Sequence, residues 1–473
     1  MKTGKDIRRL IAAAVTASLI LVMCGCGAQK TTETSDTADS SEAAYLSKED
    51  ITVNEEISSD QDGEHAIEVS GETKEYSNTG VTKTGDADGD ESDFYGENSA
   101  VFTTEKGTLA IKDSLIETNG THANAVFSYG EGTEVNVSDS VIETQGDCSG
   151  GLMTTGGGTM NAENLTINTS GRSSAAIRSD RGGGTVTVDK GYYKTSGMGS
   201  PVIYSTADIT VSSAYMESTA SQGVVVEGKN SVTLKDVTMV ADNNKKNSDK
   251  SDTYQAVMIY QSMSGDADEG TSSFTASGST ITNKNGDVFF VNNTATKISL
   301  TGNTIKNEDE DGVFLRAEAA GWGSEGSNGG KVELTASKQV IDGNILVDEV
   351  SALNLYLKDK SSFTGAVNPD GQTGDVYVEI EEGSTWKLTA DSYVSGLTVA
   401  KGSAIDLNGH KLYVDGSEYK EGSASTGEAF EIKTESTGGG PGGAPGDGQA
   451  PPDGGQGGPG GTPPEGEPPA KPE

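Results

Sequence analysis

Apolar residues recur along the chain at a nearly constant spacing. Residues 99–120, SAVFTTEKGTLAIKDSLIETNG, share their order of apolar and polar positions with residues 124–146, NAVFSYGEGTEVNVSDSVIETQG. The leading apolar position of each unit forms this series: Val101, Val126, Leu152, Ile177, Val202, Val224, Val257, Val288, Val313 and Ile345. Most gaps are near 25 residues, but those after Val224, Val257 and Val313 are 33, 31 and 32 residues, which indicates insertions into a repeat.

Each unit continues with two further short runs in which alternate residues are apolar. The first unit has Leu109 and Ile111, followed by Ile116. A period of two residues predicts strands with one buried face, and the β-branched residues agree with this. Three short strands cannot bury their apolar side chains alone, so the units must stack at about 4.8 Å per step. We therefore predict an all-β, right-handed parallel β-helix, a solenoid with about 25 residues per coil.

Polar residues and glycines also recur at fixed places in the unit. The third run of successive units ends in the following polar residues: Thr118, Thr144, Thr169, Thr195, Ser218, Asn283 and Asn307. We expect their side chains to form hydrogen bonds from coil to coil. The turn after each run contains one of these glycines: Gly120, Gly146, Gly171 and Gly197. We expect a positive φ there, which glycine adopts easily.

Composition divides the chain around this repeat. The expected regions are a signal peptide with lipobox (1–26), a flexible tether (27–47), an N-terminal cap with first irregular coils (48–98), regular coils (99–344), C-terminal coils with a cap (345–433) and a disordered Gly/Pro-rich tail (434–473). The tether is rich in Thr, Ser, Asp and Glu, and the tail has too little apolar surface to fold.

The N-terminus carries basic residues and then an apolar run over residues 10–23. A run of this length is shorter than a membrane-spanning helix and is typical of a signal peptide. Gly25 and Cys26 follow, and this end resembles the lipobox of bacterial lipoproteins. The resemblance implies acylation of Cys26, with Cys24 as the alternative, and anchoring at the outer side of a bacterial cell membrane. An ordinary secretory peptide is the other interpretation. Only Cys148 lies elsewhere, so no internal disulfide framework can form.

The charge of the chain limits its partners. The sequence holds 72 acidic and 34 basic side chains, and its net charge is −38. This balance argues against nucleic acid as a partner, because phosphates require a basic face. It also argues against electrostatic docking onto anionic lipid.

Two columns of side chains point outward in the predicted coil. The third run presents a candidate binding face for polysaccharide: Leu115, Val141, Thr166, Tyr192, Tyr215, Thr238, Thr280 and Thr304. Ordinary sheet-surface composition is the alternative interpretation. A second column directly follows the leading apolar position: Phe102, Phe127, Met153, Arg178, Ile203, Val225, Met258, Phe289 and Phe314. Adjacent residues of one strand cannot both point inward, so this stripe is either exposed as a partner surface or covered by a corner or loop.

Charged clusters offer two candidate sites. AIRSDRGGG, with Arg178, Asp180 and Arg181, is the tightest charged cluster in the repeats and a candidate catalytic group, and an ion-paired corner that leads into a glycine turn is the alternative interpretation. DADGDESD has calcium-loop spacing, but Glu91 occupies the position where a helix-flanked calcium loop has glycine, and an unliganded acidic loop is the alternative. The carboxylates that would bind Ca²⁺ are Asp86, Asp88, Asp90, Asp93 and Glu97. No cofactor is otherwise required, and the scattered histidines form no zinc or nucleophile motif.

The coil pattern resembles the pectin-lyase-like superfamily. The segments AIRSDRGGG, YSTADI, IYQSMSGDADEG, GWGSEGSNGG and TGAV resemble a bacterial group of exported, adhesin-like β-helix proteins, over roughly residues 75–416. This resemblance implies a non-catalytic surface protein that binds extracellular polysaccharide or a surface protein. The alternatives are a polysaccharide lyase or glycoside hydrolase of the superfamily, in which Arg178 would be the proton-abstracting residue, and a purely structural spacer.

Overall fold

The structure is a computed structural model that describes residues 45–423 and 425–433. The predicted signal peptide, Cys24, Cys26, most of the tether and the Gly/Pro-rich tail lie outside these residues. Among the described residues, no apolar helix reaches the length needed to cross a membrane.

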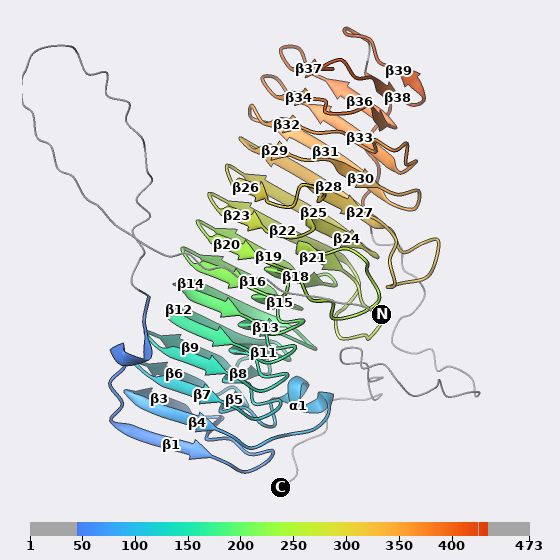
Figure 1. Ribbon diagram of the computed structural model, residues 1–473. Helices are drawn as coiled ribbons and strands as arrows, with labels where there is room; N and C mark the ends of the chain where they lie inside the picture. The colour runs from blue at the N-terminus through green and yellow to red at the C-terminus, as the bar shows by residue number, and fades with distance from the viewer. Residues whose placement is uncertain (1–44, 424, 434–473) are drawn as a thin grey trace, which may run out of the picture. The chain divides into compact units, whose positions relative to one another are not determined.

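The described chain winds into a parallel β-helix, which confirms the predicted fold class (Figure 1). Three short strands per coil form three faces that enclose one core. The only helices described are the 3₁₀-helix η1 (Lys48–Asp50) and the short helix α1 (Asp90–Tyr95). Because each coil adds its strands beside those of the coil before, the pairs run parallel and in register.

The first face is an 11-stranded sheet. Face one contains β2 (Ile67–Ser70), β5 (Val101–Thr104), β8 (Val126–Tyr129), β11 (Leu152–Thr155), β13 (Ile177–Ser179), β15 (Ile203–Ser205), β18 (Val224–Glu227), β21 (Gln255–Tyr260), β24 (Asp287–Asn292), β27 (Leu315–Ala317) and β30 (Ile345–Val347). A small last sheet contains β35 (Ser392–Val394), β38 (Leu412–Val414) and the antiparallel β39 (Ser417–Glu418).

The other two faces are joined into one 21-stranded sheet by two long strands, β12 (Gly158–Thr169) and β14 (Gly184–Thr195), which bend around the corner at Asn164 and Lys190. Besides the first halves of these strands, face two contains β3 (Thr73–Ser77), β6 (Thr108–Lys112), β9 (Glu134–Ser138), β16 (Asp208–Ser212), β19 (Ser231–Lys235), β22 (Thr271–Ser277), β25 (Thr294–Thr301), β28 (Gly330–Ser337), β31 (Ala352–Lys358), β33 (Asp375–Ile380) and β36 (Gly396–Val399).

Face three takes the second halves of the same long strands. It contains β1 (Glu55–Ser59), β4 (Thr79–Lys83), β7 (Leu115–Thr118), β10 (Val141–Thr144), β17 (Tyr215–Ser218), β20 (Thr238–Ala241), β23 (Thr280–Asn283) and β26 (Thr304–Asn307). A four-stranded sheet packs next to β26 and contains β29 (Val340–Asp342), β32 (Ser362–Thr364), β34 (Thr385–Lys387) and β37 (Ala404–Asp406).

The strand register corrects the alignment of three coils. Val101, Val126, Leu152 and Ile177 pair in one column as predicted. In three later coils, the column is continued by Ile203, Phe289 and Leu315 rather than Val202, Val288 and Val313. The replaced valines are also buried, one residue before the column in the first two coils and two residues before it in the third. Both the valine and the column residue are therefore inside, and hydrophobicity alone does not choose between them.

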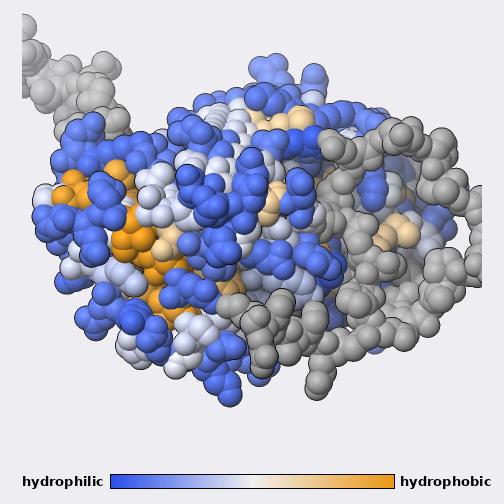
Figure 2. All heavy atoms as spheres, turned by 90° about the horizontal axis from the view of Figure 1, so that it is seen from below, coloured by the Kyte–Doolittle hydropathy of each residue, from blue (hydrophilic) through white to orange (hydrophobic). Residues whose placement is uncertain are grey.

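The core runs continuously through the coil. Apolar side chains from all three faces form one cluster that extends from the first coil to the last, and its largest members include Tyr193, Phe289 and Trp386. Such ladders bury surface that one coil alone would expose. Figure 2 looks along the coil from the β1 end and shows hydrophobic residues gathered there, where Ile57 and Ala66 are only partly buried.

One expectation for the corners is wrong, and another holds only in part. Gly120, Gly146, Gly171 and Gly197 do not have a positive φ; a Cβ on each would lie within 2 Å of a backbone carbonyl oxygen of the preceding coil. They are needed for close approach between coils. Likewise, Thr118 and Thr144 do not hydrogen-bond from coil to coil among the described residues, because their hydroxyls have no partner. Asn283 and Asn307, at the end of the same column, do form a coil-to-coil hydrogen bond. Asn283 Nδ2 donates to Asn307 Oδ1 at 3.0 Å.

Candidate functional site

The outward column of face one carries the candidate site. Its members in the observed register are Phe102, Phe127, Met153, Arg178, Tyr204, Val225, Met258, Phe290 and Arg316. Tyr204, Phe290 and Arg316 replace the predicted Ile203, Phe289 and Phe314, as the register shift requires. The replacement matters chemically, because it brings a hydroxyl and a second guanidinium into the column.

Both ends of this column are covered. At the lower end, Phe102, Phe127 and Met153 form a buried cluster next to the end of α1, where a Cβ on the C-cap Gly96 would lie within 3 Å of both phenylalanine rings. At the upper end, Val225, Met258 and Phe290 form a second buried cluster beneath Trp322. Figure 1 shows α1 beside the lower strands of face one and long loops beside the upper ones. The stripe that follows the leading apolar position was predicted to be either exposed as a partner surface or covered, and the structure confirms that it is covered.

The covering loops are the insertions seen in the repeat. They span residues 242–254 between β20 and β21, 261–270 between β21 and β22, and 318–329 between β27 and β28. These are the coils whose gaps in the apolar series are 33, 31 and 32 residues. The insertions therefore build a wall over one part of face one, and two polar members of the column, Arg178 and Tyr204, lie between the two covers.

Arg178 is the centre of a buried ion-paired group between the covers. Its Nη2 donates to Asp93 Oδ2 from α1 and to Asp180 Oδ2 of the same coil, both at 3.0 Å. The Arg178 side chain is almost fully buried, and its Nη1 has no hydrogen-bond partner among the described residues. Carboxylates on both sides raise the pKa of the guanidinium despite burial. Arg178 thus stays protonated and is unsuited to abstract a proton.

The two carboxyls respond oppositely to this arrangement. Burial raises the pKa of Asp93, but Arg178 and His122 outweigh it and hold the pKa below its usual range. Burial raises the pKa of Asp180 to about 7, which Arg178 only partly opposes and Asp266 reinforces. Asp180 therefore exchanges a proton near neutral pH, a property found more often at functional sites than elsewhere.

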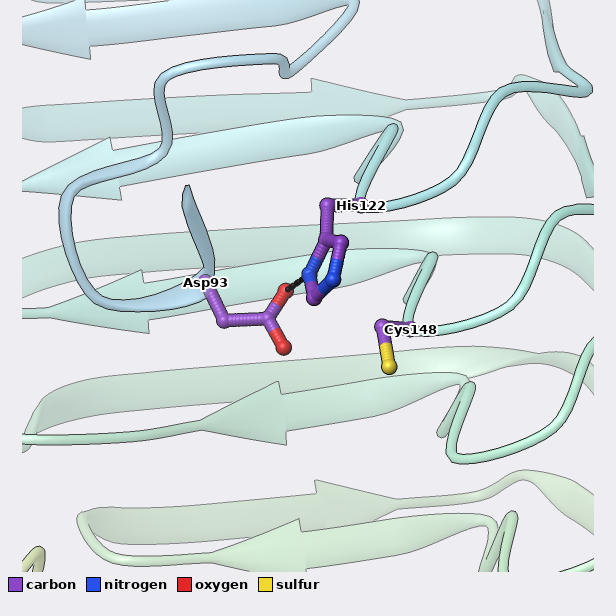
Figure 3. A group of neighbouring side chains, drawn as sticks. All are labelled: Asp93, His122 and Cys148. Atoms are coloured by element: carbon purple, nitrogen blue, oxygen red, sulfur yellow. Dashed lines mark ion pairs between the residues drawn. The ribbon is translucent and has the colours of Figure 1, made fainter. Parts of the chain in front are cut away.

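His122 and Cys148 lie beside Asp93 (Figure 3). They occupy the same corner position in successive coils, with φ of 55° and 56°. His122 Nδ1 lies 3.1 Å from Asp93 Oδ1, and donor atoms of all three residues lie within 4.8 Å of one another. Zn²⁺ takes such donors. However, the Arg178 guanidinium already pairs with Asp93, and burial raises the pKa of Cys148 to about 11. Both effects oppose a divalent cation here.

Arg181 connects the two covers. Its guanidinium lies 3.8 Å from the centre of the Phe94 ring in α1 and donates twice to Asp266 Oδ1 in loop 261–270, at 2.6 and 3.1 Å. The predicted cluster of Arg178, Asp180 and Arg181 is therefore brought together, and each arginine binds a carboxylate from a distant segment.

A cavity of about 370 Å³ opens next to this group, and we call it the face-one cavity. Its chemically distinctive lining residues are Arg178, Asp180, Tyr204, Glu227, Lys250, Tyr260, Met263, Asp266 and Trp322. A hollow of about 130 Å³ adjoins it and shares Tyr204, Tyr260 and Trp322. The rings of Tyr260 and Trp322 meet edge to face at 5.2 Å.

Glu227 lies at the wall of the face-one cavity and is 1% exposed. Its Oε2 accepts hydrogen bonds from the Tyr204 and Tyr260 hydroxyls, the latter at 2.9 Å. Its Oε1 has no well-formed hydrogen bond within the described part of the chain. Burial raises the pKa of this carboxyl, and hydrogen bonds from Ser262, Tyr204 and Tyr260 offset only part of the rise.

The candidate binding face on face three is a true column, since all eight residues pair in register from Leu115 to Thr304. Tyr192 and Tyr215 stack with ring centres 5.3 Å apart. The chain's own Tyr45 packs on both rings, at 5.0 and 6.2 Å. Val141 and Thr166 are buried. The column is therefore partly occupied by the segment that precedes β1.

The predicted calcium ligands separate in the structure. Asp93 turns inward to Arg178, whereas Asp88 and Glu97 are exposed and Asp86 Oδ1 accepts a hydrogen bond from the Thr121 amide at 2.7 Å. The side chain of Asp90 is not among those described. Asp93 is thus committed to a different structural role, and calcium binding by the remaining carboxylates stays a prediction.

Sequence reasoning missed several residues of the face-one cavity, notably Tyr204, Glu227, Tyr260 and Trp322. The one available signal was the clustering of three insertions in neighbouring coils, two of which carry the aromatic and acidic residues Trp322 and Asp266. No protein-family model, no curated protein and no solved structure matches this chain.

Proposed function

We propose that this protein is a lipid-anchored bacterial surface β-helix that binds extracellular polysaccharide in the face-one cavity. One observation carries the proposal: Arg178 Nη1 and Glu227 Oε1, both buried and both without a well-formed hydrogen bond among the described residues, belong to side chains that line the same cavity. Buried polar atoms normally have partners. A ligand rich in hydroxyl groups would supply them.

The shape and rigidity of the cavity support a sugar ligand. Its volume of about 370 Å³ is within the range of small-molecule sites. Tyr204 and Tyr260 extend from strands of a rigid sheet, so little conformational entropy is lost when a sugar ring packs against them. Trp322 adds an indole from the loop that covers the sheet.

Binding is tested with a glycan array followed by calorimetry on the soluble chain. We expect Trp322→Ala to lower the affinity at least tenfold. Tyr192→Ala, on face three, is the matched control and should leave the affinity unchanged. The opposite result, loss with Tyr192→Ala alone, would move binding to the column that runs from Leu115 to Thr304.

A second candidate function is glycoside hydrolysis in the same cavity. It is favoured by the pKa of about 7 at Asp180 and by the raised pKa of Glu227, because such carboxyls stay protonated long enough to donate a proton to a leaving group. A lyase is supported less, since the raised pKa of Arg178 keeps that residue protonated. Release of reducing ends, lost in Asp180→Asn and Glu227→Gln, would establish hydrolysis. Unsaturated products would indicate a lyase.

The membrane anchor is proposed from the lipobox-like Gly25 and Cys26. Mass spectrometry of the mature N-terminal peptide should find acyl chains on Cys26, or on Cys24 if cleavage occurs earlier. Cys26→Ser should release the protein into the medium. Release by Cys24→Ser alone would instead assign the modification to Cys24.

A further inference from the structure

Glu227 differs from the other buried carboxyls around the face-one cavity. Asp93 and Asp180 pair with Arg178, and Asp266 pairs with Arg181. Within the described chain, Glu227 forms no ion pair, and its hydrogen-bond donors, the side chains of Tyr204, Tyr260 and Ser262, are all neutral hydroxyls. A buried carboxylate without a positive partner is costly, and a ligand can relieve that cost by supplying a cation.

The surroundings of Glu227 suit a cation in a second way. Tyr204, Tyr260 and Trp322 surround the cavity next to it, and aromatic rings attract ammonium groups. The chain's own Lys250 already approaches this wall, with Nζ 5.8 Å from the Trp322 ring centre. An ammonium group is therefore compatible with the rim of the cavity.

The net charge of the chain also favours a cationic ligand. The chain carries a net charge of −38. A field of this sign concentrates cations near the surface and repels polyanions. Polysaccharides built from acidic sugars therefore approach against the field, whereas those with free amino groups approach along it.

We infer that the polysaccharide bound in the face-one cavity contains sugar units with a free, protonated amino group, and that this ammonium group binds Glu227 Oε1. Arg178 also belongs to the cavity lining, and its Nη1 donates to a hydroxyl or ring oxygen of the ligand. This inference rests on the proposed binding function and specifies its substrate class.

The test uses calorimetry to compare the affinities of the full chain for three soluble oligosaccharides. These are a glucosamine oligomer, its fully N-acetylated counterpart and a galacturonate oligomer. We expect the glucosamine oligomer to bind at least tenfold more tightly than the acetylated one, because a charged hydrogen bond is lost on acetylation. The galacturonate oligomer should bind most weakly.

Glu227→Gln should lower the affinity for the glucosamine oligomer about tenfold and leave that for the acetylated oligomer unchanged. Glu318→Gln is the matched control, since Glu318 pairs with Arg316 and does not line the cavity. Equal affinities, or a preference for the acetylated or acidic oligomer, would overturn the inference but keep polysaccharide binding. No binding of any glycan would overturn both. The comparison on the unmodified chain does not depend on how the variants fold.

Discussion

Gly146 lies at a corner where consecutive coils almost touch. A Cβ at this position would lie 1.9 Å from the carbonyl oxygen of Gly120, and the atom in the way is backbone. We expect Gly146→Ala to lower the free energy of unfolding by about 2 kcal/mol or more, since neither coil can move aside without breaking its ladder. Chemical denaturation measures the loss. Gly150→Ala is the control, because its nearest atoms are 3.1 Å away and it should cost less.

Cys148 is a thiol that the fold makes unreactive. Burial raises its pKa from 9.0 to about 11, and the nearby Asp93 adds to the rise. At pH 8 the thiolate fraction is therefore about a hundredfold lower than in the unfolded chain, and alkylation should slow by a similar factor. Peptide mass spectrometry after timed exposure to iodoacetamide measures this residue separately from Cys24 and Cys26. Similar rates in the folded and unfolded chain would contradict the prediction.

At the scale of elements, Asp93 is the buried carboxylate through which α1 pairs with Arg178. Asp93→Asn should weaken the attachment of α1 by about 3 kcal/mol, because Arg178 loses one of its two charged partners inside the protein. Hydrogen exchange of residues 90–95 should accelerate accordingly. Asp88→Asn, at an exposed position, is the control and should leave the exchange unchanged.

The attachment of α1 should also depend on pH. The folded-state pKa of Asp93 lies below its usual 3.8, so its contribution to stability is complete above that value. It is lost as the pH falls through the lower, folded-state pKa. Exchange measured between pH 6 and pH 3 should therefore show α1 opening only at the acidic end. Opening that begins near pH 6 would contradict this assignment to Asp93.

The strands were predictable from the sequence, whereas the contacts of the helix and loops that cover face one were not. The alternation of Leu109 and Ile111 is a local pattern, and burial on one face is enough to produce it. Arg178 and Asp93 are 85 residues apart, as are Arg181 and Asp266, and no local pattern links either pair. The insertions in the repeat indicated which coils carry covering loops. They did not indicate which side chains of face one lie under those loops. The slip at Val202 arose because that residue and Ile203 are both buried.

At the scale of the whole molecule, each coil is an interchangeable unit. Leu353 and Val376 are partners in adjacent coils, so removal of residues 354–376 joins equivalent positions and deletes one coil. We expect this variant to fold, with unchanged circular dichroism per residue and a smaller denaturant m-value. Removal of residues 354–365 alone should prevent ordered stacking of the coils above it. Equal behaviour of the two deletions would contradict a coil-by-coil architecture.

The segment that precedes β1 runs along the side of the coil rather than away from its base. Lys48 Nζ binds Glu117 at 2.7 Å and Glu143 at 2.5 Å, and Tyr45 rests on Tyr192 and Tyr215 of β14 and β17. A mechanical pull on Tyr45 would therefore act first on these contacts with the middle coils. The lowest strand, β1, lies outside this load path and is protected from being peeled off one hydrogen bond at a time.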